Sequence, residues 1–397
     1  MVIKNNPDLL QLNWDRLYEA NALSTATVEN ANGGNDTADY NIAKYLVSER
    51  RYDPTVINFS SIYEKIVSDA VKFNLGFNYA NQTTHNYQVV KDLLGAEYHL
   101  DLNQFAERDF PGNDSIVQND LDNPNRLVSV GDKYGYNYSN HIRKIGAWGQ
   151  TELTFKKVDF FLANEVTFTN FWREGHVRGG LFPNNSKGNS EIQKFVNFGI
   201  KSGITYKING RNYIFGNASY GTRAPFIRNS MLSPRTRNDF IADLKSQTLY
   251  SGEIGYLLKS PKIKVRLQAY AAVIENQTSN RGVYFDQSRT FGTWVLTGIN
   301  TRNIGFEAAA TFEPLAGFTI TPAVAWGDHT YTSRPNATLI EDNSNEPVFE
   351  DKTVYFKGLH LASGPQAAYS LGLGYRTPSY WFFNLNFSFF DKIYIEP

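Results

Sequence analysis

The sequence has 397 residues, of which 15% are aromatic and 20% are charged, and its mean hydropathy is -0.42. Lys plus Arg and Asp plus Glu both number 39, so no overall field favours nucleic acid or an anionic membrane surface. Cysteine is absent from the sequence, which excludes disulfides, thiolate metal sites and a cysteine nucleophile.

The N-terminal residues do not look like a targeting segment. Residues 1–10 (MVIKNNPDLL) lack the positive region and apolar stretch of a signal peptide. No apolar run reaches the roughly 18 residues that a membrane-spanning helix needs. A secreted protein needs such a segment, so a secreted form of this chain would have further residues before this sequence. We expect a first strand in residues 9–18.

Apolar and polar residues alternate with a period of two in several later segments. In residues 71–79, Val71, Phe73 and Leu75 share one face, while Lys72 and Asn74 share the other. The same alternation occurs in residues 195–208, 263–273, 304–312 and 381–389. It is typical of transmembrane β-strands, whose apolar side chains face lipid and whose polar side chains face a water-filled lumen.

Polar side chains on the second face are expected to line this lumen. They are Lys72, Asn74, Lys201, Lys207, Glu253, Arg266, Gln268, Glu307 and Arg376.

The connections alternate in length. Short turns are expected at residues 68–69, 156–157, 209–210, 260–261, 314–317 and 377–378. Long polar excursions are expected at residues 81–140, 173–194, 222–246, 278–296 and 333–362. Short periplasmic turns and long external loops are typical of outer-membrane barrels. The pattern predicts an all-β, antiparallel transmembrane barrel wall with about 12 strands after Pro54, each of roughly 12 to 16 residues.

Aromatic residues cluster where strands meet the short turns. They are Phe155, Phe160, Tyr206, Tyr213, Phe312, Phe318, Tyr375, Tyr380 and Trp381. This placement predicts an interfacial aromatic girdle. The alternative is the general preference of strands for aromatic residues.

Catalytic and metal-site patterns are not found. The sequence has no GxSxG, HExxH or P-loop motif, and its six histidines lack metal-ligand spacing. We therefore expect no enzyme activity, no catalytic residues, no metal site and no cofactor. The acidic residues 109–122 could bind calcium. A solvated loop is the better interpretation, because the offsets of an EF-hand are missing.

Two loop features are candidate cargo contacts. Trp172 and Arg173 lie at the outer end of an expected strand, where an aromatic ring can stack on a sugar or a chelate. Positive charge is concentrated in one excursion by four arginines, Arg223, Arg228, Arg235 and Arg237. Guanidinium groups suit carboxylate or phosphate recognition. The alternatives are that Trp172 belongs to the girdle and that the arginines pair with carboxylates such as Asp239 or Glu253.

Several local motifs resemble the barrel of TonB-dependent receptors of the Bacteroidetes type. They are FAERDFP at 105–111, FWREG at 171–175, GLFP at 180–183, GRNYIF at 210–215, GTRAP at 221–225, SPRTRN at 233–238 and YTSRP at 331–335. The resemblance implies a 22-stranded barrel in the cell outer membrane of a Gram-negative bacterium, closed by a plug. Residues 1–397 would then be one partial barrel domain with about 12 or 13 strands, without the plug and the final strands.

The resemblance also implies a function and partners. The receptor would take up a ferric siderophore, an oligosaccharide or another nutrient, energised by the TonB–ExbB–ExbD complex through an N-terminal region outside this sequence. Outer-membrane lipid and a surface lipoprotein would be further partners, and nucleic acid would not. The alternatives are a passive porin or channel without a plug, a barrel enzyme, and a soluble β-sheet adhesin.

Overall fold

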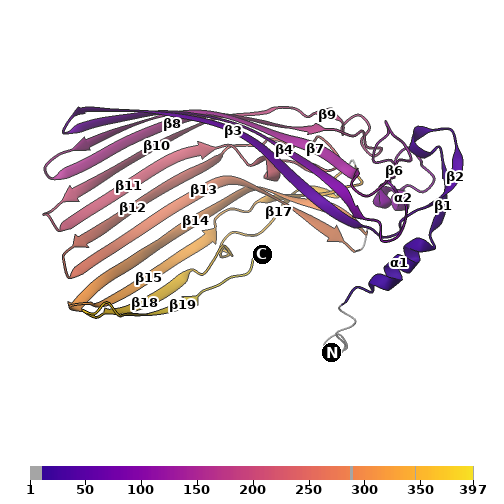
Figure 1. Cartoon of the computed structure of the whole chain (residues 1–397). Coiled ribbons are helices and arrows are strands. Elements are labelled where there is room, and N and C mark those ends of the chain that lie inside the picture. Colours follow the sequence, from indigo (N-terminus) through magenta and orange to yellow (C-terminus); the bar gives the residue numbers. More distant parts are fainter. Residues whose placement is uncertain (1–10, 287–288, 345, 397) are drawn as a thin grey trace.

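A curved antiparallel sheet dominates the computed structural model, which describes residues 11–286, 289–344 and 346–396 (Figure 1). Twelve strands follow one another along it, from β3 at one edge to β19 at the other. They are β3 (Val47–Ser68), β4 (Val71–Asp92), β7 (Lys133–Thr154), β8 (Val158–Gly175), β10 (Gln193–Lys207), β11 (Asn212–Arg223), β12 (Gln247–Lys259), β13 (Ile263–Phe285), β14 (Thr290–Leu315), β15 (Phe318–Tyr331), β18 (Ala367–Arg376) and β19 (Phe382–Asp391). Three short strands extend the sheet, namely β9 (Gly188–Asn189), β16 (Asn336–Glu341) and β17 (Phe349–Thr353). The sheet is a wall with two open edges, not a closed barrel.

All six expected short turns are confirmed, and Figure 1 shows them together at one end of the wall. The twelve expected strands are also confirmed, but several are longer than the expected 12 to 16 residues, and β18 and β19 are shorter at 10 residues each. The excursions at 81–140 and 278–296 are partly strand, since β4 runs to Asp92 and β13 runs to Phe285. Polar residues such as His85 and Ser139 continue the β4–β7 pairing there, because backbone pairing does not need apolar side chains.

The prediction of a strand in residues 9–18 is wrong for residues 11–18, the part of this range that the structure describes. A helix, α1 (Trp14–Ala22), stands there instead. Its cap explains the outcome, because the Asn13 side chain accepts a hydrogen bond from the Arg16 backbone N–H at 3.0 Å. Residues 1–10 lie outside the described part of the chain.

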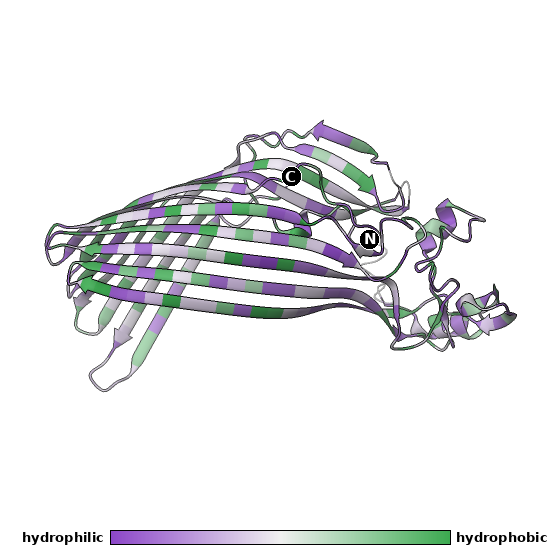
Figure 2. Ribbon diagram, turned by 90° about the horizontal axis from the view of Figure 1, so that it is seen from above, coloured by the Kyte–Doolittle hydropathy of each residue, from purple (hydrophilic) through white to green (hydrophobic). Residues whose placement is uncertain are grey.

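Hydrophilic and hydrophobic residues alternate along the strands, as predicted (Figure 2), and successive residues of a strand point to opposite faces of the wall. On the apolar face of β10, the exposed fractions of Val196, Phe198 and Ile204 are 66%, 52% and 49%. On the other face, Gln268 donates a hydrogen bond to Glu307 at 2.8 Å and accepts one from Arg266 at 2.8 Å. Further polar pairs on this face are Lys207–Asp159 at 2.6 Å, Asn217–Glu253 at 2.6 Å and Asn74–Glu152 at 3.3 Å. The expected lumen face is therefore a network of paired polar side chains.

Aromatic rings lie flat over glycines on the polar face. Trp148 faces Gly76 across the β4–β7 pair, and Tyr270 faces Gly305 across the β13–β14 pair. A Cβ atom at either glycine would collide with the ring. Glycine therefore lets a large side chain cover the backbone of the neighbouring strand.

The aromatic residues near the short turns mostly lie on the apolar face, as expected for a girdle. Tyr206, Phe312 and Tyr375 are exposed there. Tyr213 differs, because the alternation of β11 places it on the polar face, where the Lys259 ammonium lies 5.3 Å from its ring centroid.

A folded cap covers the outer ends of β3, β4 and β7 (Figure 1). It contains α1, a hairpin of β1 (Thr25–Glu29) and β2 (Thr37–Asn41), and the segment with β5 (His99–Leu100), α2 (Gln104–Asp109) and β6 (Leu127–Val128). The buried Asn21 joins its parts: its amide donates to the carbonyls of Tyr45 and Leu93 at 2.7 Å each and accepts from the Lys44 N–H at 3.0 Å. In the described part of the chain, no helix is both long and apolar enough to span a membrane.

Candidate functional site

Two cavities open on the polar face of the wall, on either side of the connection between β11 and β12. The smaller has a volume of about 770 Å³ and is bordered by residues of β7, β8, β10 and β11. The larger has a volume of about 1000 Å³ and is bordered mainly by β13 and β14. Arg223, Phe226 and Asn229 line both cavities.

The β11–β12 connection folds onto the polar face because apolar and polar contacts hold it there. Ile227 and Met231 are buried against Phe171 of β8. The Asn280 amide of β13 donates to the carbonyls of Arg228 at 2.7 Å and Met231 at 2.9 Å. The connection is thus anchored to two distant strands, and this anchoring creates the cavities.

The smaller cavity is positively charged. Its lining contains four basic side chains, Arg223, Arg228, Lys144 and Lys201, and one acidic side chain, Glu165. Arg223 is oriented by a hydrogen bond to the Gln247 side chain at 2.8 Å and lies 4.8 Å from the Phe226 ring centroid. Such a lining suits an anionic ligand.

Sequence reasoning found two of these five residues, Arg223 and Arg228, as cargo candidates. Lys201 was expected only as part of the lumen wall, and Lys144 and Glu165 were missed. The signal for them is strand alternation combined with register: Glu165 pairs with Gly199, and Lys201 pairs with Ala163, so both lie on the polar face of neighbouring strands.

The other predicted arginines hold the loops together. Arg173 is only 1% exposed and donates to the carbonyls of Pro234 at 2.7 Å and Ser186 at 2.9 Å. Arg237 is 4% exposed, and its guanidinium lies 3.4 Å from the Asp239 carboxylate. This agrees with the alternative that the arginines pair with nearby carboxylates. Arg235 packs over the Tyr136 ring at 5.1 Å. None of these three lines either of the two described cavities.

Trp172 lies on the opposite face from Arg173, because consecutive residues of a strand point to opposite sides. Its ring stacks on His141 with centroids 4.8 Å apart, and the Arg143 guanidinium lies 5.0 Å from the Trp172 centroid. Trp172 thus shares the face that carries Phe168. The sequence candidates Trp172 and Arg223 are not brought together.

Three histidines gather at the outer ends of β4, β7 and β8, although the sequence spacing suggested scattered positions. The rings of His85 and His176 lie 5.3 Å apart, and His141 contacts Glu174 at 2.9 Å. Among the residues that the structure describes, no group of three or more His, Cys, Asp or Glu side chains has the geometry of a metal site.

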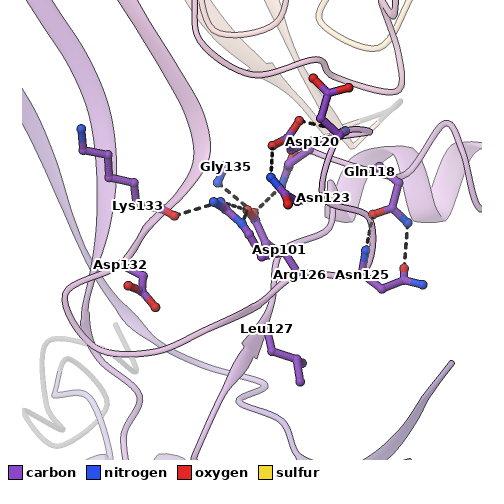
Figure 3. A network of polar contacts seen from close by, with 12 residues as sticks. Asp101, Gln118, Asp120, Asn123, Asn125, Arg126, Leu127, Asp132, Lys133 and Gly135 are labelled. Carbon is purple, nitrogen blue, oxygen red and sulfur yellow. Dashed lines mark hydrogen bonds and ion pairs between the residues drawn. The ribbon is translucent and has the colours of Figure 1, made fainter. Parts of the chain in front are cut away.

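The acidic stretch 109–122 forms part of a polar network in the cap (Figure 3). Asp122 is bound by Lys187 and Arg178, each at 2.7 Å, and these partners lower the pKa of the Asp122 carboxyl. The buried Asp101 accepts hydrogen bonds from the Asn119 side chain and the Gly135 N–H, both at 2.8 Å. These carboxylates have protein donors, which supports the loop interpretation over a calcium site.

The cap should loosen in mild acid because of His99. Burial lowers the pKa of His99, and nearby Asp101 only partly opposes this effect. The contribution of the neutral ring is therefore present above the ordinary pKa of histidine and is lost as pH falls through the lowered folded value. Hydrogen exchange of residues 93–132, corrected for intrinsic rates, should accelerate between about pH 7.5 and about pH 5. His99→Gln should flatten this dependence, and an unchanged profile would contradict it.

Comparisons with known proteins show which solved structures this fold resembles. No family model and no curated protein matches the sequence. Among solved structures, the copper transporter OprC is 10% identical with a TM-score of 0.55, over 83% of this chain and 43% of that chain. The unliganded ferric citrate transporter FecA is 12% identical with a TM-score of 0.51, over 85% and 42%. The FrpB iron transporter from Neisseria meningitidis (F3-3 variant) is 12% identical with a TM-score of 0.50, over 83% and 41%.

The chain spans less than half the length of each of these three structures. All three are transporters, for copper, ferric citrate and iron respectively. The chain has the fold of the barrel wall of TonB-dependent outer-membrane receptors.

Proposed function

We propose that this chain forms the wall of an outer-membrane receptor that takes up an anionic small molecule, such as a ferric siderophore. The positive lining of the smaller cavity supports this proposal most directly. Arg223 is the last residue of β11 and its guanidinium donates to the Gln247 side chain, while the Arg228 backbone is fixed to the wall by Asn280, so both residues are positioned before the cargo binds. Preorganised charges lose less entropy on binding than mobile ones do.

We further propose that the wall is part of a longer receptor domain that also has a plug and additional strands. The outer edges of β3 and β19 have no strand partner within the described residues. In lipid, unpaired backbone groups cost several kcal/mol each, so further strands must cover both edges. Uptake would then be driven by the TonB–ExbB–ExbD complex acting on the N-terminal region, and a surface lipoprotein could assist it.

The test is uptake by cells that produce the receptor. In the double variant Arg223→Gln with Arg228→Gln, uptake of ferric citrate or another labelled anionic ferric chelate should fall about tenfold or more, since a hydrogen bond to a charged group contributes ~1.5–3 kcal/mol. The matched control is Lys245→Gln with Lys357→Gln, two exposed cations that line neither described cavity.

Other outcomes point to the alternatives. If cells take up a labelled neutral oligosaccharide and the arginine variant does not change this uptake, the cargo is a sugar. The aromatic rings of Trp294, Tyr331 and Phe356 in the larger cavity would suit stacking on a sugar. A passive channel would conduct ions steadily in a planar bilayer without an energy source, whereas a plugged receptor would not.

A further inference from the structure

Three adjacent short turns, out of the six at this end of the wall, carry concentrated positive charge. Residues 153–159, 206–213 and 258–264 form three turns with their flanks and contain one acidic residue, Asp159. Their seven basic residues are Lys156, Lys157, Lys207, Arg211, Lys259, Lys262 and Lys264. Lys207 neutralises Asp159 at 2.6 Å. In the part of the chain that the structure describes, the other six have no acidic partner within ion-pair distance, although the whole chain is neutral.

These three turns are neighbours in the sheet. β8 pairs with β10 and β11 pairs with β12, so the turns follow one another along the rim (Figure 1). Backbone hydrogen bonds join them: the Lys207 N–H donates to the Lys157 carbonyl, and the Lys259 N–H donates to the Arg211 carbonyl, both at 2.8 Å. The charges therefore form one continuous row.

Four members of the row stand in the turns themselves and are exposed: Lys156, Lys157, Arg211 and Lys262. We call these four residues the basic rim. Lys259 and Lys264 lie on the polar face, as the alternation of β12 and β13 dictates.

The apolar face reaches the basic rim without a polar gap. Tyr206, Ile208 and Ile214 lie beside the turns and are 43%, 45% and 42% exposed. Lipid chains that pack on these residues must end at the level of the turns, so their headgroups lie beside the basic rim. Phe155, which is also exposed, lies next to Lys156. Aromatic residues adjacent to lysines are typical of a membrane interface.

We propose that the basic rim binds the phosphate groups of anionic phospholipids in the leaflet that faces the short turns. The apolar surface selects a lipid as the ligand, and the uncompensated charge selects anionic over zwitterionic headgroups. Lysine and arginine near an anionic bilayer surface each strengthen binding, and salt screens this attraction. This inference rests on the fold and does not depend on the cargo.

The experiment uses the longer receptor domain proposed above, which contains this wall with both edges covered, folded into vesicles of phosphatidylethanolamine with about one third phosphatidylglycerol. Electron spin resonance of spin-labelled lipids measures how strongly the protein surface prefers each headgroup. We expect phosphatidylglycerol to associate about fivefold more strongly than phosphatidylethanolamine, with a smaller preference at high salt. The variant Lys156→Gln, Lys157→Gln, Arg211→Gln and Lys262→Gln should lose the preference.

The control variant removes four exposed cations far from the short turns: Lys44→Gln, Lys245→Gln, Lys352→Gln and Lys357→Gln. It changes net charge equally and should keep the preference. Circular dichroism checks folding, and Lys156→Arg with Lys157→Arg and Lys262→Arg keeps the charge if the glutamine variant does not fold. The proposal fails if the native chain shows no preference, if the glutamine variant retains it, if the arginine variant loses it, or if the control loses it equally.

Discussion

Replacing Leu267 with arginine should lower the free energy of unfolding in lipid vesicles by about 2 to 4 kcal/mol. Leu267 lies on the apolar face of β13, where it is 45% exposed between Tyr256 of β12 and Ala308 of β14. A guanidinium at this position would stand in hydrocarbon without a partner. Urea titration of the vesicle-folded protein, followed by tryptophan fluorescence, measures the loss.

The matched control is Gln268→Leu, one residue further along β13 and on the polar face. It removes the hydrogen bonds to Glu307 and Arg266 but places no charge in lipid. Its cost should be about 1 kcal/mol or less, as expected for partly exposed polar pairs. Equal losses for the two variants would show that the faces are assigned wrongly.

Strand alternation predicted the wall correctly because one physical cause acts along the whole chain. Lipid on one side and water on the other impose a period of two, and the register of each neighbouring strand preserves it. The same reasoning failed where lipid does not reach. The strands β4 and β13 continue through residues 81–92 and 278–285, which were expected to be excursions, and α1 begins at a cap that the strand interpretation of residues 9–18 overlooked.

The candidate site was less predictable, since it depends on contacts between distant parts of the sequence. Nothing near Arg223 in the sequence shows that Ile227 packs on Phe171 or that Asn280 holds the connection to the wall. The basic rim could not be predicted from the overall composition, for a different reason. Equal totals of basic and acidic residues argued against an anionic membrane surface, yet the two signs are segregated, with the acidic stretch 109–122 in the cap and the lysines at the turns.

Arg173 shows how burial changes the meaning of a charged residue. Its guanidinium donates to Pro234, Ser186 and Asn238, which belong to two connections, and it lies 4.9 Å from the Tyr138 ring centroid. Arg173→Met should cost about 3 kcal/mol or more, because it leaves buried acceptors without donors. The loss should be local: hydrogen exchange should accelerate in residues 176–190 and 224–246, while β10 and β11 stay protected.

The conservative variant separates this structural role from cargo binding. Lysine keeps the charge but cannot reach three acceptors at once, so Arg173→Lys should also expose both connections to exchange. Uptake should then fall because the connection that carries Arg228 and borders Arg223 is no longer fixed. If Arg173→Lys instead abolished uptake while both connections stayed protected, Arg173 would contact the cargo directly, and the cavities would extend to it in the working receptor.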